Sequence, residues 1–545
     1  MTMVPVVIVG AGPTGLTVAT LLAQYGVQCL LLERWQSAYP QPRAVAVDDE
    51  VQRIIARLGL REKFTAVSRP HQGLRLLDTD LRVLAEIRRD RDGGRHGFPE
   101  GSMFDQPELE QLFRDNLTRY PAATLRGNAD VTALTQDADG VRVDFTDLTT
   151  GEQHCVRAGY VLGCDGANSP TRTAIGATMN DLDFTQRWLV VDVDTNADLG
   201  HWEGVQQVCD PSRAATYMRI GTTRHRWEFQ LTPGQTADDF RDMTRLHPLI
   251  ARWTGDVPVD RLRIVRMAEY TFRAQVADRW RDRRVFLLGD AAHLTPPFIG
   301  QGMAAGLRDA MNLAWKLAAV LDGTLPEAVL HTYQTERAAH ARSMIKLARL
   351  IGVVMTDSGP LGALLRSAVV PWLHVLPVIK KMTAGSQTPA LRRSALVVRA
   401  RLRRALAGHL CPNALLDDGR RFDDVAAGRF ALVTSAEPSP AEQADIAGVE
   451  VVVVHAAPGS ELHRWLRQGR AHTALIRPDG TVLSAGHSPS ALVGQLRAFA
   501  PQLPPTTAEN ENHPDVEHDP DAVADRSSLE NIHTSATPQT RGEFT

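Results

Sequence analysis

A short apolar run followed by a glycine-rich turn constrains the fold of this chain more than any other feature. Residues 6–15 read VVIVGAGPTG, and the four uncharged residues before the first glycine predict a buried strand. Gly10 permits a tight turn, Gly12 lets a pyrophosphate approach the backbone, and Gly15 lets the next helix pack closely on the strand. The N-terminus of that helix offers free N–H groups to phosphate oxygens.

A second apolar run ends in an acid at the spacing of a dinucleotide-binding unit. Residues 29–32 predict the next strand, and Glu33 follows it. The acid that binds ribose hydroxyls is expected about 20 residues after the last glycine of the turn, and Glu33 meets this spacing. Strand, glycine turn, helix, strand and acid in this order indicate that the chain binds the ADP part of a dinucleotide.

Composition fits a globular enzyme of several domains. The 545 residues predict about three domains at roughly 150 residues each. Hydrophobic residues make up 43% of the chain and charged residues 23%, so a sizeable core can be buried. The formal net charge of −3 argues against a nucleic-acid partner, because binding a phosphate backbone needs a basic excess.

Cysteine usage and hydropathy favour the cytoplasm. The five cysteines are odd in number, far apart, and form no C-x-x-C pair, so neither a disulfide framework nor a metal site is expected. The uncharged N-terminal stretch lacks the basic start of a signal peptide. The apolar tract 361–379 is broken by Arg366, Pro371 and Pro377, so no membrane span is expected.

Two later segments place an acid directly after a predicted buried strand. Asp165 begins the pattern D-G-x-x-S-x-x-R, and Asp290 lies in GDAAH, which precedes a Pro-Pro pair and Gly300-Gln301-Gly302. Ligands bind at the carboxyl ends of strands in open α/β sheets, so both acids are candidate ligand contacts. Taken singly, Asp165 could belong to an ordinary turn, and His293 is better explained by a local hydrogen bond than by acid–base catalysis.

The three segments together resemble the single-component FAD-dependent aromatic hydroxylases, the family of p-hydroxybenzoate hydroxylase and phenol hydroxylase. The resemblance covers about residues 4–345. It implies bound FAD, NADH or NADPH as a transient reductant, O2, and a phenolic substrate hydroxylated ortho to its hydroxyl. A plain NAD dehydrogenase would not need the second and third segments, and a flavin-dependent halogenase would carry a W-x-W-x-I-P stretch, which is absent.

The resemblance also implies site residues. Arg43 suits a pyrophosphate because its guanidinium fork matches phosphate oxygens. A helix starting near Met303 would direct its positive end at the flavin and stabilise the negative charge of its reduced form. The expected cofactor-binding set is Gly10, Gly12, Gly15, Glu33, Arg43, Gln106, Asp165, Asp290, Pro297, Gly300, Gly302 and Met303. No catalytic residue is assigned.

A narrower resemblance concerns the substrate. Segments 42–50, 188–192, 209–211, 226–229 and 309–317 look like those of the 3-(3-hydroxyphenyl)propionate and 3-hydroxycinnamate hydroxylases of aromatic catabolism. A propionate carboxylate would need an arginine, and Arg226 is the candidate chosen from Arg213, Arg219 and Arg226. A hydroxylase of a polyketide or antibiotic in secondary metabolism shares most of these motifs and stays an alternative.

The expected fold is α/β: a Rossmann-like FAD-binding domain with an inserted β-sheet substrate domain, a helical segment and a C-terminal thioredoxin-like domain. Residues 1–180 and 276–405 form the FAD-binding domain with the helical region, and residues 181–275 form the substrate domain of short strands. Residues 406–503 form the thioredoxin-like domain, which lacks C-x-x-C, and 504–545 a disordered tail. Assembly into a homo-oligomer stays open.

Overall fold

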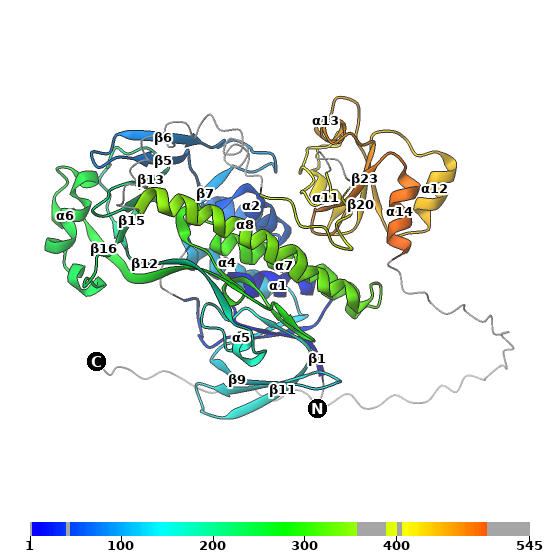
Figure 1. Cartoon of the computed structure of the whole chain (residues 1–545), viewed down its shortest axis with the longest axis horizontal. Helices are drawn as coiled ribbons and strands as arrows, with labels where there is room; N and C mark the ends of the chain where they lie inside the picture. Colours follow the sequence, from blue (N-terminus) through cyan, green and yellow to red (C-terminus); the bar gives the residue numbers. More distant parts are fainter. Residues whose placement is uncertain (1–2, 40–43, 357–387, 400–405, 499–545) are drawn as a thin grey trace, which may run out of the picture. The chain divides into compact units, whose positions relative to one another are not determined.

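The computed structural model describes residues 3–39, 44–356, 388–399 and 406–498 (Figure 1). Its first sheet has a parallel centre in the order β18-β11-β1-β2-β8. These strands are β1 (Met3–Val9), β2 (Cys29–Leu32), β8 (Ala123–Arg126), β11 (Gln153–Gly163) and β18 (Val285–Leu287). Antiparallel strands β9 (Ala129–Gln136), β10 (Val141–Asp147) and β17 (Arg281–Asp282) extend this sheet.

Helices cover this sheet because their apolar faces need burial. Helix α1 (Pro13–Gln24) follows the glycine turn and packs beside α7 (Gly302–Leu321), as Figure 1 shows. These two helices contact α2 (Asp49–Arg57), α4 (Gln106–Leu117) and α8 (His331–Thr356); α3 (Arg61–Val67) packs on α2 and α4, and α5 (Pro170–Ala174) packs against β9. Asp48 caps α2, since its Oδ1 accepts a hydrogen bond of 2.9 Å from the backbone N–H of Val51.

The second sheet is mostly antiparallel, in the order β19-β16-β12-β15-β14-β13-β5-β6. Its strands are β5 (Gly73–Leu77), β6 (Val83–Arg88), β12 (Met179–Asp194), β13 (Val205–Val208), β14 (Ala215–Arg219), β15 (Arg224–Gln230), β16 (Arg263–Ala277) and β19 (His293–Leu294). It therefore takes two strands from before residue 181. A small third sheet consists of β3 (Ala46–Asp48), β4 (Arg69–Pro70) and β7 (Gly101–Met103), paired antiparallel in the order β3-β7-β4.

One face of the second sheet is apolar and packs on helix α6 (Met243–Thr254). Side chains alternate between faces along a strand, so Leu189, Trp227 and Phe229 share this face and meet Ile250 and Trp253 of the helix. The sequence predicted only short strands between residues 181 and 275, and helix α6 corrects that prediction. Its apolar spacing is helical, but Pro248 stands inside it and obscures the signal.

The C-terminal part folds around a four-stranded sheet in the order β21-β20-β22-β23, in which only β20 and β21 are parallel. Its elements are α11 (Phe422–Ala426), β20 (Ala431–Thr434), α12 (Pro440–Ala447), β21 (Val452–His455), α13 (Glu461–Gln468), β22 (Thr473–Ile476), β23 (Val482–Gly486) and α14 (Pro489–Arg497). Likeness to thioredoxin stays a prediction for this unit.

Two segments differ in how the structure bears on their predictions. Residues 388–399, expected to be helical, are irregular, because their backbone bonds to the C-terminal sheet: Val398 N donates to Leu483 O at 2.8 Å. The tract 361–379 and the tail 504–545 lie outside the described residues. None of the helices in the described ranges is long and apolar enough to cross a membrane.

Candidate active site

The glycine turn between β1 and α1 has the geometry that its glycines predict. Gly10 adopts a φ of 97°, and a Cβ there would lie 2.5 Å from the carbonyl oxygen of Cys164 at the end of β11. A Cβ on Gly15 would lie 2.0 Å from the oxygen of Gly10. A Cβ on Gly12 would meet no protein atom within 4 Å. The space beside Gly12 is therefore open, as approach of a pyrophosphate requires.

Glu33 lies beside this turn. Its Oε2 accepts a hydrogen bond of 2.6 Å from Ala11 N, and its Oε1 accepts one of 3.0 Å from Trp35 N. These bonds fix the carboxylate at the carboxyl end of β2, next to the open space at Gly12. The residues present thus fit an ADP moiety: a turn with free space, a helix N-terminus and an acid beside both.

Asp165 and Asp290 follow adjacent parallel strands, β11 and β18. Asp165 accepts hydrogen bonds from Ser169 Oγ at 2.5 Å and Thr171 N at 2.8 Å. Burial raises the pKa of Asp165, and these two hydrogen bonds act in the opposite direction. Both acids therefore stand at the same edge of the sheet as Gly10 and Glu33.

A buried acid, Asp309, holds the turn that contains Asp290. The sequence did not indicate this role. Asp309 on α7 accepts hydrogen bonds from Gly289 N at 3.0 Å, His293 Nε2 at 2.8 Å and Arg337 Nε at 2.8 Å. His293 is fully buried, and its ring stacks on Trp280 with centroids 5.1 Å apart. His293 therefore makes a local hydrogen bond. The sequence favoured this role for His293 over acid–base catalysis.

The loop before α7 is anchored to the start of α2. Gly300 is left-handed, and α7 begins at Gly302 with Met303 in its first turn. Gln301 Nε2 donates to Asp48 Oδ2 at 2.9 Å, and Arg308 Nη2 donates to the same oxygen at 2.6 Å. Burial alone would raise the pKa of Asp48, but the charge of Arg308 and the hydrogen bonds hold it below its usual range.

Gln106 stands at the first turn of α4 and fixes the chain after residue 43. Its Oε1 accepts a hydrogen bond of 2.7 Å from Ala44 N. Arg43 itself lies outside the described residues. The contacts of Gln106, Arg43, Pro297 and the other expected residues with a flavin stay predictions.

Arg226 lies within a buried chain of ion pairs. Its Nε and Nη2 donate to the two oxygens of Asp192 at 2.7 and 3.0 Å, and both side chains are fully buried. Arg266 donates to Asp192 at 3.0 Å and to Asp105 at 2.6 Å, and Asp105 directly precedes Gln106. This network of ion pairs thus connects the second sheet to the residue that precedes α4. Any contact between Arg226 and a substrate stays a prediction.

A row of side chains crosses the second sheet on the face opposite α6. The strand registers pair Gln207 with Thr216, Thr216 with Glu228, and Glu228 with Val190. Directly paired residues share a face, so these four form one line across β13, β14, β15 and β12. Sequence reasoning missed this row. The available signal was that Glu228 alternates with the apolar Trp227 and Phe229 along β15.

This row lies next to the loop that precedes α7. Gln207 Nε2 donates to the carbonyl oxygen of Phe298 at 2.9 Å. The Phe298 ring meets Trp188 edge-on, with centroids 5.8 Å apart, and Phe184 at 5.7 Å. Aromatic side chains and a polar row therefore border the loop 297–302 from the side of the second sheet.

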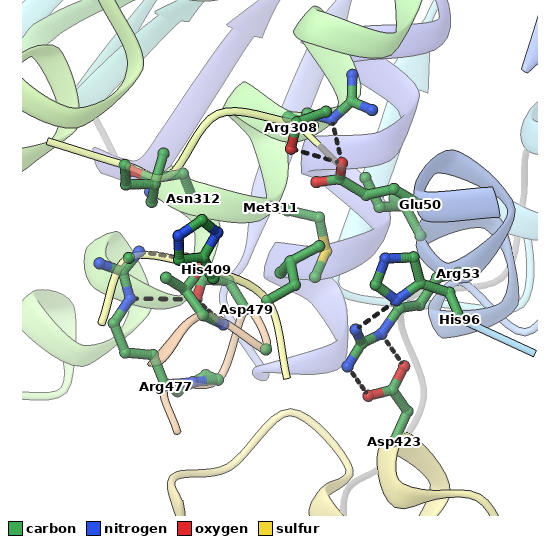
Figure 2. A pocket seen from close by; sticks show the side chains of 18 of the residues that line it. Glu50, Arg53, His96, Arg308, Met311, Asn312, His409, Asp423, Arg477 and Asp479 are labelled. Carbon is green, nitrogen blue, oxygen red and sulfur yellow. Dashed lines mark hydrogen bonds and ion pairs between the residues drawn. The ribbon is translucent and has the colours of Figure 1, made fainter. Parts of the chain in front are cut away.

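A separate cavity of about 340 Å³ lies between α2, α7 and the C-terminal part (Figure 2). Its three acids are each bound by an arginine: Asp423 by Arg53 at 2.5 Å, Glu50 by Arg308 at 2.9 Å, and Asp479 by Arg477. Figure 2 shows Met311 between these pairs. An arginine pairs with each of these acids and neutralises its charge. We therefore interpret this cavity as a packed interface between parts of the chain.

Comparison with known proteins agrees with this geometry. The family model described as FAD binding domain matches residues 3–348. A relative from Rhodococcus jostii (strain RHA1), named probable NADH-specific resorcinol 4-hydroxylase, is 34% identical over 92% of this chain and 96% of its own. A relative from Mycobacterium sp. (strain KMS), named 3-(3-hydroxy-phenyl)propionate/3-hydroxycinnamic acid hydroxylase, is 36% identical over 69% of this chain and 64% of its own.

The fold is shared with a solved flavoenzyme. The flavin-dependent monooxygenase PieE, solved in complex with FAD and substrate, aligns with a TM-score of 0.76 at 24% identity, over 91% of this chain and 99% of its own. The α/β fold class, the FAD cofactor and the enzyme class expected from the sequence are confirmed. The chain belongs to the family of FAD-dependent aromatic-ring monooxygenases.

Proposed function

We propose that this enzyme hydroxylates a meta-substituted phenol ortho to its hydroxyl. The phenol, O2, NADH or NADPH and a proton give the catechol-type product, oxidised nicotinamide nucleotide and water. The substrates in the names of the two relatives, resorcinol and 3-(3-hydroxyphenyl)propionate, are both phenols with a second group at the meta position. The observation that carries the proposal is the polar row Gln207–Thr216–Glu228 beside the loop 297–302.

The residues proposed to hold FAD fall into groups according to the part of the cofactor that each would contact. The glycine turn and Glu33 bind the ADP part, and Arg43, Gln106, Asp165 and Asp290 bind along the pyrophosphate and ribityl chain. Pro297, Gly300, Gly302 and Met303 surround the flavin ring. These residues would hold FAD, which when bound and reduced by the nicotinamide nucleotide would supply the activation of O2; one oxygen atom of O2 enters the ring and the other leaves as water.

The chain itself supplies orientation and exclusion of water. Phe298, Trp188 and Phe184 form an aromatic wall beside the proposed ring site. A wall of this kind would exclude water from the reaction and so favour hydroxylation over the release of hydrogen peroxide. The buried network of Asp48, Gln301 and Arg308 keeps the loop in place without a ligand.

Product analysis tests the proposal. Purified protein loaded with FAD is given NADH or NADPH, ¹⁸O2 and a panel of phenols that includes resorcinol and 3-(3-hydroxyphenyl)propionate. The expected result is a product carrying one ¹⁸O atom ortho to the original hydroxyl. Hydrogen peroxide alone with every phenol contradicts the proposal, and turnover of polycyclic phenols only would favour the polyketide or antibiotic alternative.

Three further expectations from the sequence belong with this proposal. They are the domain limits at residues 180, 275, 405 and 503, the thioredoxin-like fold of the C-terminal part, and a cytoplasmic location. The cysteine pattern supports the last, because it shows no disulfide framework. Limited proteolysis with mass analysis of the fragments tests the domain limits, and cell fractionation tests the location.

A further inference from the structure

The cavity in the interface between α2, α7 and the C-terminal part carries positive charge that its acids do not neutralise (Figure 2). Among the described residues, six arginines and three acids line it. Four of these arginines pair with carboxylates: Arg53 with Asp423, Arg308 with Glu50, Arg337 with Asp309, and Arg477 with Asp479. The other two, Arg57 and Arg95, form no ion pair within the described part of the chain.

Arg57 lies at the C-terminal end of α2, and its contacts bring no negative charge. Its Nη1 donates to Gln24 Oε1 at 2.5 Å, and its guanidinium lies 5.8 Å from the centroid of the Tyr25 ring. Its Nε is buried and has no hydrogen-bond partner among the residues described. Since buried donors without acceptors are rare and costly, the guanidinium is suited to an acceptor that is not part of the protein.

Arg95 lies in the loop between β6 and β7, close to the same end of α2. The loop meets α2 where Arg53 Nη1 lies 3.3 Å from His96 Nδ1, and Arg57 follows Arg53 by one turn on the same face of the helix. Burial raises the pKa of the Cys411 thiol, and the charges of Arg53 and Arg95 act in the opposite direction. The charge of Arg95 therefore reaches the C-terminal part across the cavity.

A buried histidine on α8 also lines the cavity without a partner. His340 is 4% exposed, and neither of its ring nitrogens has a hydrogen-bond partner in the described ranges. Burial and the charges of Arg337 and Arg308 lower its pKa well below the ordinary value, so the ring is neutral. A neutral imidazole offers one donor and one acceptor, and both suit a hydroxyl group.

The rest of the lining limits what the cavity can hold. It includes apolar and aromatic side chains: Ile54, Met311, Leu391, Leu410, Phe422 and Trp465. The exposed residues His409 and Gln468 also line it, so the cavity reaches solvent there. Residues 358–416 contain neither Asp nor Glu, so this stretch of the sequence offers no acid to balance the two arginines. The volume of about 340 Å³ falls in the range of small-molecule pockets, roughly 300–1,000 Å³.

We propose that this cavity is a further ligand site, which binds a small organic phosphate: Arg57 and Arg95 bind the phosphate, and the organic part lies on the apolar wall with a hydroxyl group at His340. A phosphate monoester carries nearly two negative charges at pH 7, which match two unpaired guanidinium groups, and the guanidinium fork matches phosphate oxygens. The site does not depend on the proposed function, because neither arginine is assigned to FAD or to the phenol.

The test measures binding of AMP to four proteins, all loaded with FAD so that the cofactor site is filled. They are the wild type, Arg57→Gln, Arg95→Gln and the control Arg91→Gln. Arg91 lies in the same loop as Arg95, but it is exposed and does not line the cavity. Equilibrium dialysis at constant ionic strength and pH 7.5 gives the Kd and the number of AMP molecules bound per chain. Inorganic phosphate and malonate, a dicarboxylate, serve as competitors.

The wild type is expected to bind one AMP per chain, and inorganic phosphate should displace it better than malonate. The Kd should rise about tenfold or more in Arg57→Gln and in Arg95→Gln, because each loses a charge-assisted contact with the phosphate. Arg91→Gln should keep the Kd of the wild type. Without ligand, Arg95→Gln should have a higher Tm than the wild type, because one unbalanced charge is removed, and saturating AMP should reverse this order.

The outcomes decide the proposal without an activity assay. Absence of AMP and phosphate binding by the wild type, or an equal Kd in all four proteins, overturns the site. Equal displacement by malonate and phosphate overturns the choice of a phosphate. If Arg57→Gln does not fold, Arg95→Gln decides, because its side chain has no protein partner to lose among the described residues. Failure to hydroxylate any phenol, with AMP binding as expected, contradicts the proposed function alone.

Discussion

Glu336 and Glu228 are both buried glutamates, but their surroundings push their pKa values in opposite directions. Glu336 on α8 accepts hydrogen bonds from Lys316 Nζ at 2.9 Å, Asn312 Nδ2 at 2.8 Å and Ser394 Oγ at 2.6 Å, and it pairs with Arg477 at 3.0 Å. Burial would raise its pKa, yet the charges of Arg477 and Lys316 bring it down to about 2. Burial raises the pKa of Glu228 to about 7, because no donor compensates.

The difference separates an acid held by four protein groups from one that receives no hydrogen bond within the described residues. Glu336 joins α7 and α8 to Arg477 of the C-terminal part, and every donor it needs is already present. Glu228 stands in a sheet face next to the loop 297–302, and the protein leaves its oxygens open. A closed network stabilises a fold, whereas an open acceptor costs stability that a bound ligand can return.

The largest expected effect concerns the closed network. Glu336→Ala leaves Lys316 and Arg477 buried without this partner, so the free energy of unfolding should fall by about 3–5 kcal/mol. Denaturant titration of the FAD-loaded protein measures this. A loss below about 1 kcal/mol would mean that Glu336 does not stabilise the contact of α7 and α8 with Arg477 of the C-terminal part.

The open acid should behave in the opposite way. The folded-state pKa of about 7 lies above the ordinary 4.5, so the folded protein binds more protons than the unfolded chain between these values. The contribution of Glu228 to stability therefore falls as pH rises from 4.5 to 7. At pH 8, Glu228→Gln should be more stable than the wild type by up to about 3 kcal/mol, since one pKa unit is about 1.4 kcal/mol.

The pH dependence provides the control for this second experiment. At pH 4.5 and below, the stability difference between Glu228→Gln and the wild type should shrink toward zero, because Glu228 is protonated in both states. For Glu336 the sign is reversed: its folded pKa is lowered, so its contribution is complete above 4.5 and is lost as pH falls through about 2. A destabilised Glu228→Gln at pH 8 would show that the carboxylate has a donor after all.

Two glycines of the first turn offer the same contrast between closed and open surroundings. A Cβ on Gly15 would meet the oxygen of Gly10, whereas one on Gly12 would meet only open space. Gly12→Ala should therefore leave the unfolding of the apoprotein almost unchanged but weaken FAD binding about tenfold, which corresponds to about 1.4 kcal/mol. Gly15→Ala should destabilise the apoprotein. Equal effects of both substitutions on stability would contradict an open space at Gly12.

The smallest effect is expected where an ion pair reaches solvent. Arg281 and Glu327 form a pair of 2.6 Å, but the glutamate side chain is 54% exposed. Glu327→Gln should change the free energy of unfolding by less than about 1 kcal/mol, since water screens the charge. This variant is the matched control for Glu336→Ala, and a comparable loss in both would remove the distinction between buried and exposed networks.

How far the sequence predicts this molecule depends on how local each signal is. The turn at Gly10, the acid Glu33 and the cap Asp48 were predictable because each depends on neighbours within one strand–turn–helix unit. Glu228 and Gln207 were not, because only the pairing of β13, β14 and β15 brings them into one row. Asp309 was likewise hidden, since its three donors come from the turn after β18, from β19 and from α8.

A crystal structure of the FAD-loaded enzyme with a phenol bound is the most direct test of the proposed site. We predict that the flavin ring lies beside the loop 297–302, with the ADP part at Gly12 and Glu33 and the phenol ring facing the second sheet. A flavin bound away from this loop, or a phenol bound away from the second sheet, would contradict the proposal.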